Sequence, residues 1–126
     1  MPKGNIYKTE TLDTNLTNSP ELYLALFQTD PGADGSGTEV SYSGYARIPI
    51  VWGPAVINGS LGEKKNTNFI EFSTVPSTSG YAAYAAVMTL ASGGNVVYYG
   101  ALGANYQLMA GIKPTVPIGS LTITES

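Results

Sequence analysis

Glycine and proline interrupt this sequence at short intervals, and the segments between them are short runs rich in apolar, aromatic and β-branched residues. The 126 residues include 15 glycines and 8 prolines. Turn formers at this density fit short strands better than helices. The sequence therefore predicts an all-β fold, a β-sandwich of about six to eight short antiparallel strands with one short N-terminal helix or arm.

The first two predicted strands differ in how they meet the sheet. Residues 22–27 form a continuous apolar run between Pro20 and a turn-rich segment, which indicates a buried strand. Residues 45–52 follow it, and their alternation places Ile48, Ile50 and Trp52 on one face. Because Pro49 cannot donate a ladder hydrogen bond, this second strand is expected to be an edge strand or to carry a bulge.

Four further strands are expected in the second half of the chain. Residues 80–90 have the alanine content of a helix, but the alternation of their side chains favours a strand. Residues 120–126 alternate with Leu121 and Ile123 pointing inward. The remaining two strands are expected at residues 68–75 and 95–102.

The N-terminal segment is the one place where a helix is expected. Residues 9–16 have a weak helical pattern that Thr11 or Asp13 would cap and that the "NSP" at residues 18–20 ends. We therefore divide the chain into an N-terminal arm or short helix, residues 1–18, and a single β-sandwich domain, residues 19–126. Residues 60–68 and 76–80 are expected to be exposed loops.

Composition excludes several classes of function. There is no cysteine and no histidine, which removes disulfides, thiolate metal sites and the commonest general base. The net charge of −3 argues against a nucleic-acid partner. The polar N-terminus has no signal-peptide pattern, and the longest apolar run, residues 81–91, is far short of the ~20 residues that span a bilayer. We expect a protein that is made in the cytosol, is not secreted by the general route and has no membrane partner.

Catalytic constellations are nearly absent, so the chain is not expected to be an enzyme. A serine paired with Lys64 or Lys65 would be an alternative nucleophile, but these lysines are adjacent and are expected in a solvated loop. A glycosidase needs two carboxylates facing one cleft. Asp30 and Asp34 lie in a turn and Glu71 stands alone in a strand. No catalytic, cofactor-binding or metal-binding residues are assigned.

The loop "TDPGADGSGTEV", residues 29–40, allows three interpretations. Asp30, Asp34 and Glu39 offer calcium ligands, but without the EF-hand spacing. A phosphate-binding loop would need a basic residue and a following helix, and neither is present. The proline and glycines instead favour consecutive turns, so at least one of Gly32 and Gly35 should have a positive φ.

Aromatic residues are the other candidate site makers. Exposed tyrosine and tryptophan stack on sugar rings and anchor interfaces, whereas strand tyrosines often serve only as good β residues. For the adjacent Tyr98 and Tyr99, one side chain must face away from the core. The residues to test for carbohydrate binding are Tyr42, Tyr45, Trp52, Tyr98 and Tyr99.

Charge is distributed unevenly along the chain. Residues 72–112 contain no Asp, Glu, Lys or Arg. A small monomer normally spreads charge over its whole surface. This long uncharged stretch indicates either a central core region or a face covered by another subunit.

Three stretches resemble a known family. They are "LYLALFQTDPGADGSGTEVSYSGYARIPI" (residues 22–50), "ASGGNVVYYGAL" (residues 91–102) and "IGSLTITES" (residues 118–126). They are similar to the signatures of small tail fibre proteins of tailed bacteriophages, in which an apolar strand precedes "TDPG", a Gly/Ser-rich loop and "YAR", and an "SGGN" turn leads into a strand ending "YGAL".

The resemblance implies a virion structural protein with a β-sandwich core, made in the host cytoplasm and carrying no catalytic residue. We expect a tail fibre or tail-associated subunit that assembles as a homo-oligomer, a trimer, and contacts other virion proteins. A capsid decoration protein, either cement or head fibre, is the first alternative because it needs the same fold. The second alternative is a module that binds carbohydrate on the host surface.

Overall fold

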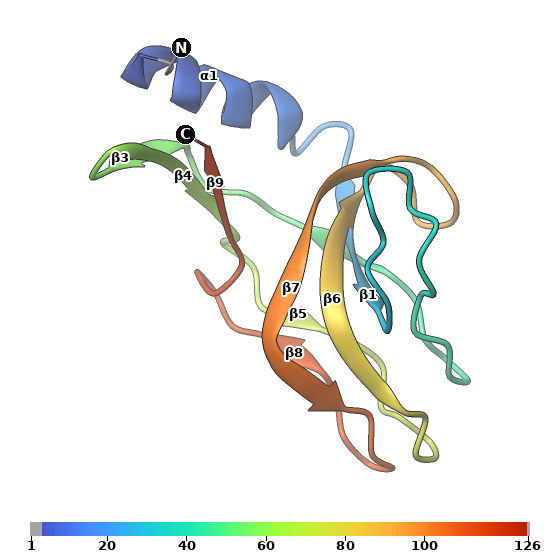
Figure 1. The fold of residues 1–126 in the computed structure, drawn as a ribbon. Helices are drawn as coiled ribbons and strands as arrows, with labels where there is room; N and C mark the ends of the chain where they lie inside the picture. The colour runs from blue at the N-terminus through green and yellow to red at the C-terminus, as the bar shows by residue number, and fades with distance from the viewer. Residues whose placement is uncertain (1–3, 126) are drawn as a thin grey trace.

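The structure is a computed structural model, and it describes residues 4–125 of the chain. Within these residues it contains one helix, α1 (Asn5–Asn15), and nine strands that pair in an antiparallel manner (Figure 1). The strands form a sandwich-like arrangement around a shared core. The predicted all-β class with one short N-terminal helix is confirmed. No helix in the described part of the chain is long and apolar enough to cross a membrane.

The larger layer is a four-stranded sheet with the order β2-β1-β6-β7. Its strands are β2 (Ile48–Ile50), β1 (Leu22–Phe27), β6 (Tyr81–Met88) and β7 (Val96–Gln107). The side chains of β1 are buried on both faces of the sheet, since Leu24 points into the main core and Phe27 into a smaller cluster with Ala86 and Met88. A strand buried on both faces has a continuous apolar sequence, as residues 22–27 do.

The opposite layer is made of two small sheets. One has the order β3-β4-β9, with β3 (Val56–Asn58), β4 (Leu61–Lys65) and β9 (Thr122–Glu125). The other pairs β5 (Ile70–Glu71) with β8 (Thr115–Val116). Leu24 of β1 belongs to the same core cluster as Ile70 of β5 and the neighbouring Phe72. The core therefore lies between the two layers.

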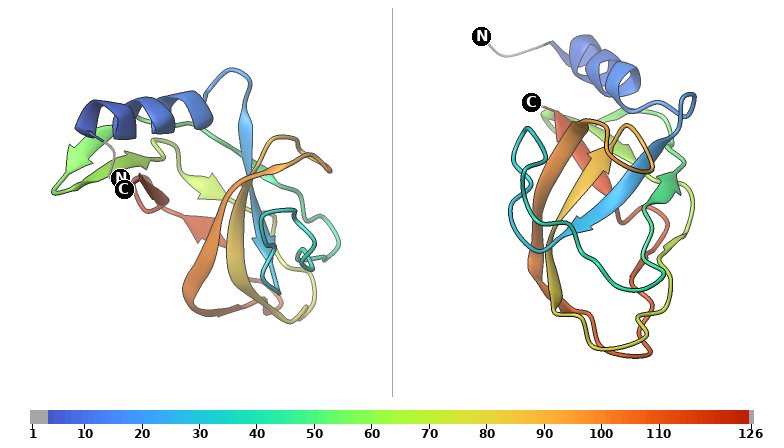
Figure 2. Two further views of the ribbon diagram at one scale, coloured as in Figure 1. Left: turned by 45° about the horizontal axis from the view of Figure 1, so that its top comes forward. Right: turned by 90° about the vertical axis from the view of Figure 1, so that its right-hand side faces the viewer.

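Helix α1 lies across the three-stranded sheet, as Figure 2 shows. Leu12 and Leu16 are fully buried and belong to the main core cluster. Lys64 of β4 donates to Asp13 of the helix at 2.7 Å, which fixes the helix over the sheet. The helix spans Asn5–Asn15, so it begins and ends earlier than the predicted residues 9–16. Neither Thr11 nor Asp13 caps it, because its N-cap residue is Gly4, which makes no side-chain capping bond.

Several predicted strands are confirmed. Residues 22–27 form the buried strand β1, and the segment with the high alanine content is β6 rather than a helix. The strand with Pro49 lies at the edge of its sheet, a position where a residue without an N–H is tolerated. Of the predicted residues 120–126, Thr122–Glu125 form β9, and Ser126 lies outside the described residues. The predicted alternation is confirmed, since Leu121 and Ile123 pack against the core while Thr122 and Thr124 are exposed.

Other predictions were wrong in their bounds. Of residues 45–52 only Ile48–Ile50 form a strand, and of residues 68–75 only Ile70–Glu71 do so. The strand predicted at residues 95–102 continues to Gln107. The predicted exposed loop at residues 60–68 is also wrong, because it contains β4, which pairs with both β3 and β9.

Candidate functional site

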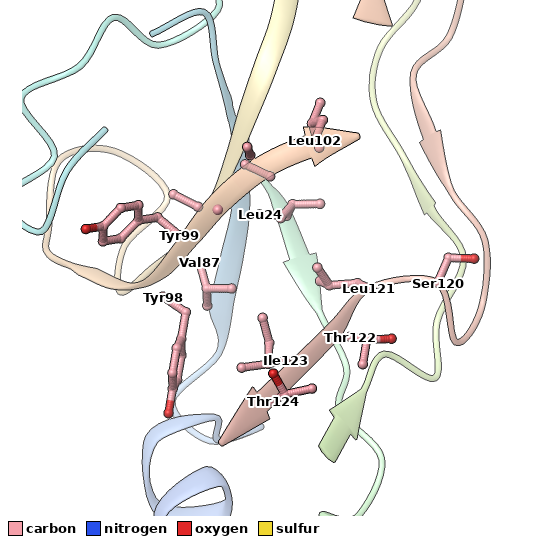
Figure 3. A pocket seen from close by; sticks show the side chains of 14 residues that line it. Leu24, Val87, Tyr98, Tyr99, Leu102, Ser120, Leu121, Thr122, Ile123 and Thr124 are labelled. Atoms are coloured by element: carbon pink, nitrogen blue, oxygen red, sulfur yellow. The ribbon is translucent and has the colours of Figure 1, made fainter. Parts of the chain in front are cut away.

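The candidate site is an open groove between the edges of the two layers. Strand β7 is the last strand of the larger sheet and β9 is the last strand of the three-stranded sheet. The groove between them has a volume of about 330 Å³, and none of its lining residues is charged. In Figure 3 the side chains of Leu121 and Ile123, from the β9 side, point toward those of Leu24 and Val87. We call this hollow the β7–β9 groove.

The groove follows from the side-chain pattern of its walls. Alternation in residues 120–126 directs Leu121 and Ile123 toward the core, and because β9 pairs with β4 on one side only, the other side stays open. On the opposite wall, Tyr98 and Leu102 of β7 pack partly against the core. The lining is therefore aliphatic and aromatic, with threonine hydroxyls along one rim.

One end of the groove lies next to α1. The Tyr98 hydroxyl lies 3.4 Å from the side-chain nitrogen of Asn15 and 3.5 Å from a carboxylate oxygen of Glu125. These contacts join β7, the end of the helix and the end of β9 at one point. Tyr99 points away from the groove in Figure 3 and is 48% exposed. The expectation that one of the two adjacent tyrosines faces away from the core is confirmed.

The loop at residues 29–40 follows β1 and returns beside its end, where Val40 donates to the carbonyl oxygen of Leu26. Asp30 accepts from the backbone N–H of Gly32 at 2.9 Å, and Asp34 accepts from that of Ser36 at 3.1 Å. Hydrogen bonds with the side chain and the backbone N–H of Ser36 hold the pKa of Asp34 below its ordinary value. Gly32 and Gly35 have φ of 64° and 74°, which confirms the predicted turns.

The third acid of this loop has a separate role. Glu39 accepts from Nε and Nη2 of Arg47 at 3.0 and 2.9 Å and from the hydroxyl of Tyr45 at 2.7 Å. Nη1 of Arg47 donates to the carbonyl oxygens of Leu90 and Gly93. We call this arrangement the Arg47 clamp. The hydrogen bonds to Glu39 raise the pKa of Arg47, while burial raises that of Tyr45.

The three acids of the loop do not converge on a common point, since each is hydrogen-bonded within its own turn or clamp. Among residues 4–125, no group of three or more potential ligands is placed to hold a metal ion. A second hollow, of about 490 Å³, lies beside the Arg47 clamp. Its charged lining residues, Glu39 and Arg47, are already paired with each other.

The five aromatic residues singled out in the sequence are not assembled into one platform. Tyr45 stacks on Phe72 with ring centroids 6.0 Å apart, and Tyr42 meets Tyr45 edge to face at 5.5 Å. Trp52 is 4% exposed, and its indole nitrogen has no hydrogen-bond partner among the described residues. Four of the five rings, all but that of Tyr99, therefore belong to the core or its margin, and Tyr98 also lines the β7–β9 groove.

The remaining candidates also have structural contacts. Lys64 is buried beneath α1 with only 7% exposed, so the expectation that it lies in a solvated loop was wrong. Lys65 lies 3.3 Å from Glu63, and Glu71 lies 3.6 Å from Lys113. Leu102, Leu121 and Ile123 were not predicted from the sequence to belong to a site. The alternation of residues 120–126 and the uncharged stretch at residues 72–112 were the signals that could have found the groove.

The described part of the chain is thus rich in β-strands and has an uncharged groove at the edge of its larger sheet. Residues 5–124 match a family model described as Gp80, podophage GP4 fiber I protein gp80. The match covers nearly the whole chain, so the protein belongs to this family of podophage fibre structural proteins. The family implies a virion-associated protein. No curated protein matches the chain.

Proposed function

We propose that this chain is a subunit of a phage tail fibre or of a tail-associated complex, where it assembles as a homo-oligomer, a trimer. The observation that carries the proposal is the match of residues 5–124 to a podophage fibre family. The match gives the class of structural protein, and the tail location and self-assembly are our extension of it.

The contacts within the structure support a structural role. The acids of residues 29–40 hold turns and the Arg47 clamp, and Lys64 holds the helix. The groups that offered alternative chemistry are thus used to fix the fold. The edge of β7 and the apolar groove beside it are uncharged and open, and surfaces of this kind serve in protein contacts.

The location is tested by electron microscopy of intact virions labelled with a gold-conjugated antibody against this chain. We expect label at the tail and a low copy number per particle. Label over the head, at hundreds of copies, would contradict the tail proposal and make the protein a capsid decoration subunit. Virions that carry no chain by mass spectrometry would contradict both roles.

Self-assembly is tested separately by light scattering on the purified chain. The monomer mass is 13.2 kDa, and we expect about three times this value at micromolar concentration. A particle of 13.2 kDa across that range would refute the homo-oligomer. The chain would then bind only to a surface that other virion proteins have already formed.

A further inference from the structure

The outer edge of β7 differs from the other free sheet edges in the described residues. Proteins normally protect free edges with short strands, proline, charge or β-bulges. Strand β2 has three residues and Pro49, β3 has three residues, and β9 has four residues including Glu125. Strand β7 has twelve residues and no charge, and no strand of residues 4–125 pairs with its outer side.

The edge of β7 is irregular, but it retains a regular section. Its pairing with β6 shifts between Val87 and Met88 and again between Ala82 and Tyr84. Such bulges bend a strand and increase its twist. Between the two shifts, residues 98–101 pair regularly with residues 84–87, and these same four residues of β7 line the groove. A regular, unprotected backbone edge therefore lies beside an apolar hollow.

Two glycines in β7 have no explanation within the subunit. Glycine weakens a strand, and in strands it often marks a place where another backbone approaches closely. At Gly62 of β4 a Cβ would lie 3.0 Å from the Cβ of Lys8, so the helix requires that glycine. At Gly100 and Gly103 of β7 a Cβ would meet nothing within 4 Å, and neither residue has a positive φ. The space at these glycines is filled by no other residue of the described chain, and Gly100 lines the β7–β9 groove.

The charge distribution favours a second copy of the same chain as the occupant. Two copies with a net charge of −3 each repel one another, unless they meet through surfaces without charge. Residues 72–112, which include all of β6 and β7, provide such a surface. A strongly charged partner would find no complementary charge in the groove, because every lining residue is neutral.

From these observations we propose that β7 of one copy lies against the β7–β9 groove of the next copy. The inference rests on the proposed function, since it requires the chain to assemble with itself. A closed ring of three copies joins two different parts of the surface at each contact. The free edge of β7 and the β9 wall of the groove are two such parts, and strand addition to an exposed edge is a known mode of recognition.

Two lysine substitutions test the two sides of this contact. Gly103→Lys places a charge on β7 where the monomer has open space, and Thr124→Lys places one on the exposed rim of the groove. Phe69→Lys is the matched control, because Phe69 is 52% exposed and lies outside the uncharged stretch. The oligomer mass is measured by light scattering across a dilution series, and circular dichroism checks that each variant is folded.

We expect the wild type and Phe69→Lys to be oligomers, and both test variants to need at least tenfold higher concentration to associate. If either of the two test lysines leaves the oligomer unchanged, the inference is wrong, while the proposed self-assembly stands. A wild type that is monomeric would overturn both. If Phe69→Lys also dissociates, the effect comes from added charge in general and the assignment of β7 and its groove is wrong.

Discussion

The Arg47 clamp provides the sharpest prediction for stability. Replacing Arg47 with Met keeps most of the apolar stem and removes the guanidinium, which makes four hydrogen bonds: two to Glu39 and one each to the carbonyl oxygens of Leu90 and Gly93. The carboxylate of Glu39 keeps its bond from Tyr45 but loses its counter-charge. The substitution also frees the turn before β7 from the loop at residues 29–40.

The exposure of the two side chains sets the size of the effect. Breaking a buried ion pair costs about 3–5 kcal/mol, whereas an exposed pair contributes about 0–1 kcal/mol. The side chain of Arg47 is 8% exposed and that of Glu39 is 27% exposed, so the pair lies nearer the buried limit but retains contact with water. The carbonyl oxygens of Leu90 and Gly93 belong to exposed residues and can bond to water instead. We therefore expect a loss of about 2–3 kcal/mol in the free energy of unfolding.

Urea unfolding followed by fluorescence measures this loss, because Trp52 is the single tryptophan and is buried. Protein concentration is held fixed, since association adds to apparent stability. The control is Lys113→Met, which breaks the exposed pair with Glu71 at 3.6 Å and should change the free energy by about 0.5 kcal/mol or less. A loss for Arg47→Met no larger than that of the control would refute the clamp as a stabilising element.

Three further predictions concern the turns, the helix and acid. Gly32→Val and Gly35→Val should each cost about 1–2 kcal/mol in urea titrations, because both glycines have a positive φ; unchanged midpoints would show that the turns tolerate a side chain. Leu12→Ala should cost about 2–5 kcal/mol and weaken the protection of α1 against hydrogen exchange, since Leu12 is fully buried; a smaller loss would mean that α1 docks weakly. The pKa of Asp34 is lowered in the folded state by its bonds with Ser36, so its contribution is present above the ordinary carboxyl pKa and is lost as pH falls through the folded value. Asp34→Asn should therefore reduce the difference in stability between pH 6 and pH 3, and an unchanged difference would contradict this assignment.

The strands that could be predicted from sequence are those whose side chains carry a clear signal. The continuous apolar run of residues 22–27 became β1 because both of its faces are covered. The alternation of Leu121 and Ile123 placed both residues on the core side. Pro49 predicted that its strand lies at a sheet edge, because a residue without an N–H is tolerated only there or at a bulge.

Strand β4 could not be predicted, because its signal depends on the helix. Its sequence, LGEKK, has the composition of a loop, and lysine is seldom buried. Lys64 is buried only because Asp13 of α1 lies above it and its carboxylate accepts a hydrogen bond from Nζ of Lys64 at 2.7 Å. Gly62 is likewise required by the approach of Lys8. These are contacts between residues about fifty positions apart, and no local pattern contains them.

The extension of β7 to Gln107 was missed for a different reason, and that reason bears on the candidate site. Residues 100–107 contain two glycines and two alanines and show little alternation, so their sequence gives almost no strand signal. Most of β7 is exposed along this length, with Tyr106 at 39%. A strand that covers little core is under weak selection for a core pattern. Residues 96–107 also contain no charge that would protect a free edge. The strand with the weakest signal in the sequence is therefore the one that we assign to contacts between subunits.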